Sequence, residues 1–158
     1  GVCSSIAGAR RVLVTGLAGS SPLAIGFDYL LSRIGVSSSV VPEGYTLAIR
    51  AALLDPGDVF FAISFSGATK DILAAAAIAK GRGATVISLT NFRNAPLVEQ
   101  ADFSLFTATD PDPVYSEISI NIAGHMVLEI VFQRLYEMRP GSSEVVARTF
   151  RAISDRRL

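Results

Sequence analysis

A short polar segment, SFSGATK at residues 64–70, stands between two strongly apolar stretches of the chain. Three of its residues carry hydroxyl groups, namely Ser64, Ser66 and Thr69. Gly67 would let backbone amides come close to a ligand, because glycine has no side chain to block them. Lys70 would add a positive charge next to the hydroxyl groups. These residue types together are suited to holding an anion.

The segment lies where a predicted strand at 59–63 meets a predicted helix at 69–80. The first N–H groups of a helix have no intrahelical partner, and the helix dipole adds partial positive charge there. An anion, typically a phosphate group, binds well at such a junction. The sequence therefore predicts an anion site here. Capping of the helix by Ser66 is the structural alternative, and it accounts for only one of the hydroxyl groups.

A second junction of the same kind, TGLAGSS at 15–21, follows a predicted strand at 11–15. It contains Gly16, Ser20 and Ser21. Ligands of open parallel sheets bind beyond the carboxyl ends of the strands, so both junctions are expected to face one ligand. Helix capping is again the alternative for the two serines.

Two nucleotide-binding motifs are excluded by the same segments. GLAGSS lacks the full G-x-G-x-x-G pattern of dinucleotide sites, and the chain contains no G-K-[ST] sequence of a P-loop. Glu43 is the nearest acidic residue to the end of the second strand, but Pro42 before it is better explained as strand termination. We also expect no metal ion and no cofactor.

The elements that must position these residues alternate along the chain. Strands are predicted at 11–15, 36–42, 59–63, 84–90 and 103–107. Helices are predicted at 20–33, 45–54, 69–80, near 96–100 and from about 115 to 137. Alternating strands and helices, with strands that lack polar alternation, indicate a parallel sheet covered on both faces. The predicted fold is an α/β protein, a three-layer α/β/α sandwich with a five-stranded parallel sheet.

The composition narrows the class of protein further. The chain has 158 residues, half of them hydrophobic, and 14 basic residues balance 14 acidic ones. Such a chain fits one domain, lacks the basic footprint of a nucleic-acid binder, and has no segment that qualifies as a membrane span. Cys3 is the single cysteine, so no internal disulfide can form, and a cytoplasmic location is expected. Because Gly1 stands where a methionine would begin a protein, we interpret the chain as part of a longer one.

The two polar segments also carry a family resemblance. SFSGAT resembles S-x-S-G-x-T, the hallmark of the SIS (sugar isomerase) domain, and GLAGSS stands at the position of its first motif. The resemblance covers nearly the whole chain, and GDVFFAISFSGATKDILAAAAIAKGRGATVISLTN is similar to the SIS domain of RpiR-type transcriptional regulators. One departure is Ala18, which replaces the second glycine of the usual first motif and puts the backbone path of that loop in question.

The resemblance implies a flavodoxin- or Rossmann-like fold and a phosphosugar ligand. The residues it implies at the ligand are Gly16, Ser20, Ser21, Ser64, Ser66, Gly67, Thr69 and Glu117. It also implies an SIS domain at 1–140 and a C-terminal helix or tail at 141–158. In RpiR-type regulators a DNA-binding helix-turn-helix domain precedes the SIS domain, so contact with DNA is expected only through a domain outside this chain.

The residues leave an enzyme and a sensor open, and favour the sensor. Aldose–ketose isomerisation needs a general base and a second acid–base group near the sugar. Glu117 is the main candidate for an isomerase, and His125 lies among apolar neighbours of a helix, where packing explains it better. We therefore assign no catalytic residue and expect a phosphosugar sensor of carbohydrate metabolism. A stand-alone phosphosugar isomerase and an oligomerisation module with a vestigial pocket are the alternatives.

The long helix predicts a partner subunit. Its apolar residues cover more than one helical face, which is broader than a surface helix needs: Ile118, Ile120, Ile122, Met126, Val127, Leu128, Ile130, Val131 and Leu135. We expect a homo-oligomer, a dimer or a tetramer. The tail RTFRAISDRRL, with four arginines, is interpreted as a solvated amphipathic helix.

Overall fold

A computed structural model describes residues 1–109 and 116–154, apart from the side chains of 116–120. Its strands are β1 (Val12–Gly16), β2 (Ser38–Val41), β3 (Val59–Ile63), β4 (Thr85–Thr90) and β5 (Phe103–Phe106). Its helices are α1 (Val2–Gly8), a 3-10 turn η1 (Ala18–Ser20), α2 (Ser21–Arg33), α3 (Gly44–Ala52), α4 (Lys70–Gly81), α5 (Pro96–Gln100), α6 (Ser116–Met138) and α7 (Ser142–Ser154). None of the helices in these ranges has the length and hydropathy that a membrane span requires.

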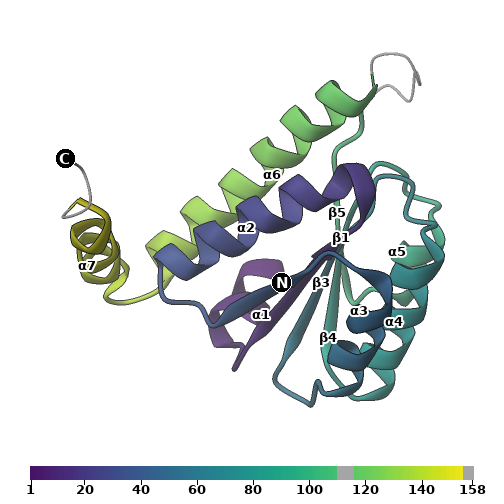
Figure 1. The fold of residues 1–158 in the computed structure, drawn as a ribbon, viewed down its shortest axis with the longest axis horizontal. Coiled ribbons are helices and arrows are strands. Elements are labelled where there is room, and N and C mark those ends of the chain that lie inside the picture. The colour runs from purple at the N-terminus through teal and green to yellow at the C-terminus, as the bar shows by residue number, and fades with distance from the viewer. Residues whose placement is uncertain (110–115, 155–158) are drawn as a thin grey trace.

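The five strands form one sheet in the order β2-β1-β3-β4-β5, and every neighbouring pair is parallel. Helices α1, α2 and α6 cover one face, and α3, α4 and α5 cover the other (Figure 1). The predicted α/β/α sandwich with five parallel strands is confirmed. Because all strands run the same way, the loops after β1 and β3 emerge at one edge of the sheet.

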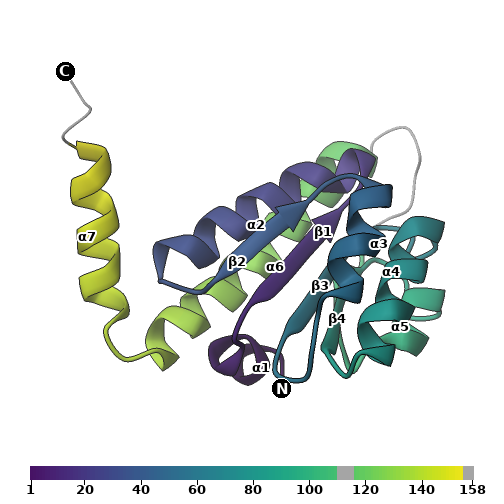
Figure 2. The same cartoon turned by 60° about the horizontal axis from the view of Figure 1, so that its bottom comes forward.

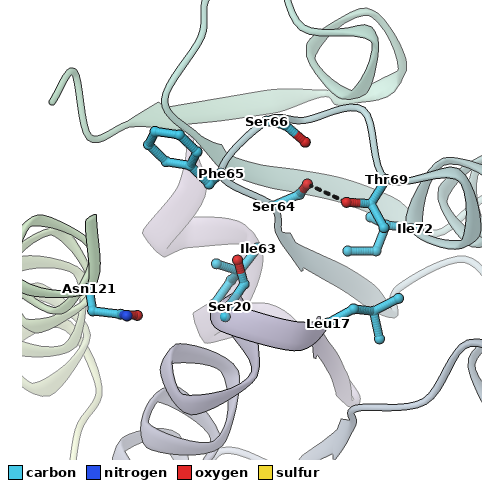
Figure 3. A pocket seen from close by; sticks show the side chains of 10 residues that line it. Leu17, Ser20, Ile63, Ser64, Phe65, Ser66, Thr69, Ile72 and Asn121 are labelled. Atoms are coloured by element: carbon cyan, nitrogen blue, oxygen red, sulfur yellow. Dashed lines mark hydrogen bonds between the residues drawn. The ribbon is translucent and has the colours of Figure 1, made fainter. Parts of the chain in front are cut away.

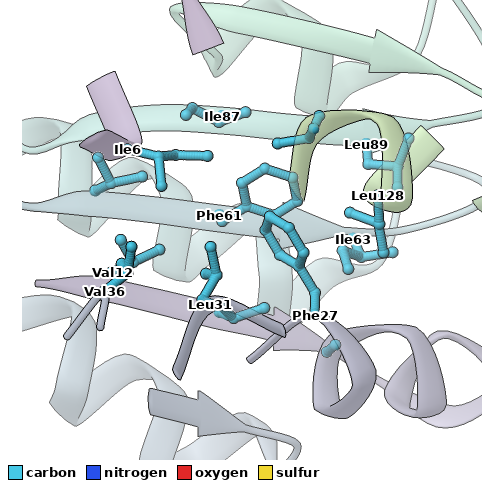
Figure 4. Close-up of a cluster of buried hydrophobic side chains, with 14 of the residues drawn as sticks. Ile6, Val12, Phe27, Leu31, Val36, Phe61, Ile63, Ile87, Leu89 and Leu128 are labelled. Carbon is cyan, nitrogen blue, oxygen red and sulfur yellow. The ribbon is translucent and has the colours of Figure 1, made fainter. Parts of the chain in front are cut away.

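Two apolar cores fill the space between the sheet and the helices on its two faces. On the α2 and α6 face, the rings of Phe27 and Phe61 lie 4.7 Å apart between centroids, among Ile63, Leu89 and Leu128 (Figure 4). Complete burial of side chains of this size contributes about 1.5–3 kcal/mol each. Every residue of β1 and β3 is buried, as expected for central strands covered on both faces.

Most predicted elements shift by one or two residues at their ends, and two differences have a clear physical cause. β2 begins at Ser38 rather than at 36, because the amide of Val36 donates to the carbonyl of Leu31 and closes α2 over Gly35. Gly35 has φ 74°, the left-handed conformation that favours glycine at a helix end. Helix α1 was not predicted, since its seven residues hold no side-chain cap and only Ile6 is buried, against distant segments.

Helix α7 stands at the side of the domain rather than over the sheet (Figure 2). It packs with Val146 against the α2 and α6 core, while Phe150 and Ile153 further along are exposed. Arg148 and Arg151 are also exposed. The described part of the tail is thus an amphipathic helix, and the last four residues lie outside the described ranges.

Candidate functional site

A cavity of about 290 Å³ lies at the carboxyl ends of β1 and β3, beside α6 (Figure 3). The loop after β3, the loop after β1 and one residue of α6 form its walls. The residues that line it are Leu17, Gly19, Ser20, Ile63, Ser64, Phe65, Ser66, Thr69, Ile72 and Asn121. The two polar junctions of the sequence therefore meet in one cavity at the same edge of the sheet.

The loop after β3 places the hydroxyl groups of Ser64, Ser66 and Thr69 at the cavity, and those of Ser64 and Thr69 face each other. The Oγ of Ser64 lies 3.1 Å from the Oγ1 of Thr69, within hydrogen-bond distance. The Oγ of Ser66 accepts from the amide of Ala68 at 3.2 Å. Thr69 is the N-cap residue of α4, yet it makes no side-chain capping bond. Helix capping therefore does not explain why hydroxyl groups gather here.

Backbone amides of the same loop are available to a ligand. In the described part of the chain, the amides of Ser66 and Thr69 donate to no protein acceptor. The same holds for the amides of residues 70–72 in the first turn of α4. Such N–H groups, at the positive end of a helix dipole, are suited to an anion.

Gly67 shapes this loop without lining the cavity. Its φ is 59°, and a Cβ built on it would lie 2.4 Å from the Cβ of Ala95 and 2.9 Å from the Oγ1 of Thr90. A side chain would therefore force the loop away from β4. From the sequence we expect Gly67 at the ligand. In the structure it acts instead by allowing the backbone of the loop to pass close to Ala95 and Thr90.

The loop after β1 contributes Ser20, which is the N-cap residue of α2 and makes no side-chain capping bond. Ser21 begins α2, and neither it nor Gly16 lines the cavity. A Cβ on Gly16 would lie 2.5 Å from the carbonyl oxygen of Ser20, so glycine is needed to let the loop fold back on β1. Ala18 has φ 47°, and a non-glycine residue in the left-handed region is strained.

Helix α6 places one polar residue at the cavity that the sequence interpretation missed. In Figure 3, Asn121 points from α6 toward the side of Ser20. It follows Glu117 by four residues, the spacing of one helical turn, and this spacing could have found it. Glu117 belongs to the first turn of α6, but its side chain lies outside the described residues. His125 is exposed, borders Gly26 of α2 and does not line the cavity.

The described walls of the cavity carry no charged side chain. Lys70 is exposed at the start of α4 and does not line it. Glu43 is used elsewhere: its carboxylate caps α3 by accepting from the amides of Thr46 and Tyr45. These bonds, chiefly those to Thr46, lower the pKa of Glu43. Recognition of an anion by these walls would rest on hydroxyl groups, amides and the dipole of α4.

Comparison with known proteins places this architecture in a family. The SIS domain family matches residues 5–134. An uncharacterised HTH-type transcriptional regulator of Caldanaerobacter subterraneus subsp. tengcongensis is 34% identical over 129 residues, 81% of this chain and 46% of the relative. The chain thus spans about half the length of that curated relative.

Solved structures agree with this placement. The NanR protein of Vibrio vulnificus, complexed with ManNAc-6P, has a TM-score of 0.91 at 26% identity, over 99% of this chain and 60% of NanR. The sugar isomerase domain of an RpiR transcription factor from Sphaerobacter thermophilus has a TM-score of 0.84 at 25% identity, over 96% of this chain and 83% of that one.

A third structure extends the likeness of fold. A Methanococcus jannaschii protein with an inferred function of 3-hexulose-6-phosphate isomerase has a TM-score of 0.78 at 19% identity, over 93% of this chain and 80% of that one. The family match, the parallel sheet and the S-x-S-G-x-T loop agree, and the resemblance to RpiR-type SIS domains is confirmed. This chain belongs to the SIS domain family.

Proposed function

We propose that this chain is the phosphosugar-binding effector domain of an RpiR-type transcriptional regulator of carbohydrate metabolism, acting in the cytoplasm. The observation that carries the proposal is the cavity lined by Ser64, Ser66 and Thr69, next to amides at the start of α4 that donate to no acceptor among the described residues. Relatives support it, since one is an HTH-type regulator and another, NanR, was solved with ManNAc-6P. A phosphoryl group would occupy the anion cradle, by which we mean the loop from Ser64 to Thr69 and the first amides of α4. The sugar would extend toward Ser20 and Asn121.

The chemistry of the walls favours a sensor over an enzyme. Isomerisation requires proton transfer by positioned acid–base groups. The described lining residues offer hydroxyl and amide groups, and neither a carboxylate nor an imidazole is among them. An isomerase remains the second candidate because the fold also occurs in a protein with an inferred isomerase function, and Glu117 would then be its base.

Calorimetry and NMR separate the three candidate functions. Titrating the chain with ManNAc-6P, fructose 6-phosphate, ribose 5-phosphate and inorganic phosphate should give binding of at least one sugar phosphate. Following the same mixtures by NMR should show no isomerisation, whereas turnover at enzyme-like rates would establish the isomerase. No binding of any sugar phosphate, together with no effect of Ser66→Ala on any ligand response, would establish a vestigial pocket. Ser4→Ala, at an exposed position of α1, is the control variant.

We further propose that the domain acts as a homodimer formed through α2 and α6. Helices α2 and α6 pack against each other, so their outer surfaces can form one continuous face. Five apolar side chains on these helices are each more than half exposed: Ile25, Tyr29, Ile122, Met126 and Ile130. Ile118 and Ile120 of the predicted set lie outside the described side chains. Apolar faces of this kind on soluble proteins commonly mark interfaces.

A pair of matched variants tests the dimer. Ile130→Glu changes the α6 face, and Ile49→Glu changes an apolar residue of α3 on the other side of the sheet; the two are 66% and 54% exposed. Light scattering at micromolar concentration should give a dimer for the unchanged chain and for Ile49→Glu, and a monomer for Ile130→Glu. A monomeric unchanged chain would contradict the proposal.

Ligand control of such a dimer requires the sugar phosphate to bind one arrangement of subunits better than another. Contact with DNA would come through a helix-turn-helix domain outside these residues, and the SIS domain at 1–140 would carry the ligand response. The coding sequence ahead of Gly1 tests this part directly. A helix-turn-helix there would support the regulator, and a chain that starts at the SIS domain would favour the isomerase.

A further inference from the structure

The carbonyl oxygen of Phe65 receives two hydrogen bonds from the end of β4. The Oγ1 of Thr90 donates to it at 2.9 Å, and the backbone amide of Asn91 donates at 3.0 Å. Phe65 stands between Ser64 and Ser66 in the loop that lines the cavity. Thr90, the last residue of β4, and Asn91 after it therefore fix the orientation of a peptide group in this loop, although neither residue lines this cavity.

The orientation of that peptide group determines where the Ser66 amide points. In a trans peptide the C=O and N–H groups lie in one plane and point in opposite directions. In the sheet, β4 and β1 lie on opposite sides of β3. A Phe65 carbonyl directed toward β4 therefore directs the N–H of Ser66 toward the β1 side, where Leu17, Gly19 and Ser20 line the cavity. Within the described residues, this N–H donates to no protein acceptor.

We propose that Thr90 is a positioning residue of the anion cradle: its hydroxyl group holds the Phe65 carbonyl and so aims the Ser66 amide at the phosphoryl group of the ligand. The inference rests on the proposed function, because it assigns the oriented amide to a phosphate. A preoriented N–H group stabilises an anion without reorganising when the anion arrives.

Thr90 is the part of this arrangement that a substitution can remove. The amide of Asn91 belongs to the backbone and remains in every variant, and the Asn91 side chain is occupied with Thr107 and Thr109 at 2.6–3.0 Å. Thr90 is 1% exposed, and valine has nearly the same shape without the hydroxyl group. Thr90→Val would leave the Phe65 carbonyl with one donor and the Ser66 amide less fixed.

The chain contains a matched control. Thr15 is also buried near the carboxyl end of a central strand, and its Oγ1 donates to the carbonyl of Val41 at 2.8 Å. Thr15 does not line the cavity. Thr15→Val therefore removes the same kind of buried hydroxyl-to-carbonyl hydrogen bond, whereas Thr90→Val also removes the acceptor of a longer bond, 3.5 Å, from the amide of Phe92. Both variants should lower the melting temperature.

Calorimetry with inorganic phosphate and with ManNAc-6P on the whole chain tests the proposal. We expect Thr90→Val to weaken both affinities by about five- to tenfold, the loss typical of one hydrogen bond. Thr15→Val should stay within about twofold of the unchanged chain. Thr90→Ser, which keeps the hydroxyl group and loses the methyl group, should retain the affinity. Equal affinities for Thr90→Val and Thr15→Val would overturn the proposal, as would equal losses for Thr90→Ser and Thr90→Val.

A measurement on the unchanged chain covers the case in which Thr90→Val does not fold. In ¹H–¹⁵N spectra, adding inorganic phosphate should shift the Ser66 amide resonance strongly. Binding that leaves this resonance in place would overturn the role of Thr90 while the proposed function stands. Failure of the unchanged chain to bind any of the tested phosphates would overturn both.

Discussion

The hydroxyl oxygens of Ser64 and Thr69 lie 3.1 Å apart, joining the end of β3 to the start of α4 across the candidate anion site. Ser64 is 3% exposed, so its hydroxyl group is held in one place by the surrounding loop. With the oxygens in place, the hydroxyl hydrogens can rotate, so each group can donate to the other or to a bound phosphate.

This pair predicts a specific mutational pattern. Ser64→Ala and Thr69→Val should each weaken binding of a sugar phosphate by about 1 kcal/mol, because each removes a donor to the anion. The double variant should lose less than the sum, since the hydroxyl groups support each other. Isothermal titration of the four chains measures the coupling. Ser88→Ala, which breaks the buried 2.8 Å hydroxyl pair with Ser104, is the control and should leave affinity unchanged. Additive losses would show that the two hydroxyl groups act separately.

The uncharged walls predict weak dependence of binding on salt. Ionic strength screens interactions between charges, and the described lining residues carry none. Affinity for ManNAc-6P should change less than about threefold between 50 and 500 mM NaCl, the range over which the Debye length falls below about 10 Å. Lys70→Ala should behave like the unchanged chain, because Lys70 is exposed outside the cavity. A tenfold or larger loss of affinity with salt would indicate a cation at the ligand.

The strained residue Ala18 predicts a stabilising substitution. At φ 47° an L-residue costs about 1–2 kcal/mol, and glycine has no such penalty. This gain is partly offset, because glycine's greater freedom in the unfolded chain favours unfolding by about 0.4–1 kcal/mol. Ala18→Gly should therefore raise the free energy of unfolding by about 0.5–1 kcal/mol. Chemical denaturation measures it. Ala77→Gly, at an exposed position within α4, should instead lower stability by about 1 kcal/mol. A loss of stability in Ala18→Gly would show that this loop is unstrained.

The buried carboxylate of Asp58 predicts the response of stability to acid. Its oxygens accept from Arg10, from Arg11 at 2.9 Å and from the amide of Asp55 at 2.9 Å. Burial raises the pKa of Asp58, but the amide of Asp55 and the guanidinium of Arg11 outweigh it, and the pKa is lowered overall. The stabilisation is therefore present above the ordinary aspartate pKa and is lost as pH falls through the lowered value.

Asp58→Asn tests this sign. At pH 7 it should lower the free energy of unfolding by about 2 kcal/mol, because charged hydrogen bonds to a buried group are lost. The difference from the unchanged chain should shrink as the pH falls through the lowered pKa of Asp58. Glu137→Gln, which breaks an exposed pair with Arg134, should change stability by less than about 0.5 kcal/mol. If the difference in free energy of unfolding stayed constant with pH, the charge of Asp58 would not be the source of the stabilisation.

Much of this protein is determined by local sequence. The apolar runs of β1 and β3 have no polar alternation, which is possible only for strands covered on both faces, so the parallel sandwich could be predicted. The spacing of Ser64, Ser66 and Thr69 after such a strand places three hydroxyl groups at one strand–helix junction. Ser20 meets them because parallel strands end at the same edge.

Other features depend on segments that are distant in sequence. Asn121 reaches the cavity only because α6 packs beside α2, and the Ser66 amide is aimed by Thr90, which follows it by 24 residues. Gly67 is required by the approach of Ala95, and α1 forms because Ile6 is buried against the sheet. Periodicity and spacing in the sequence indicate whether a residue will be buried or will lie at a strand end. Which distant residue it then contacts depends on how the helices and strands pack together.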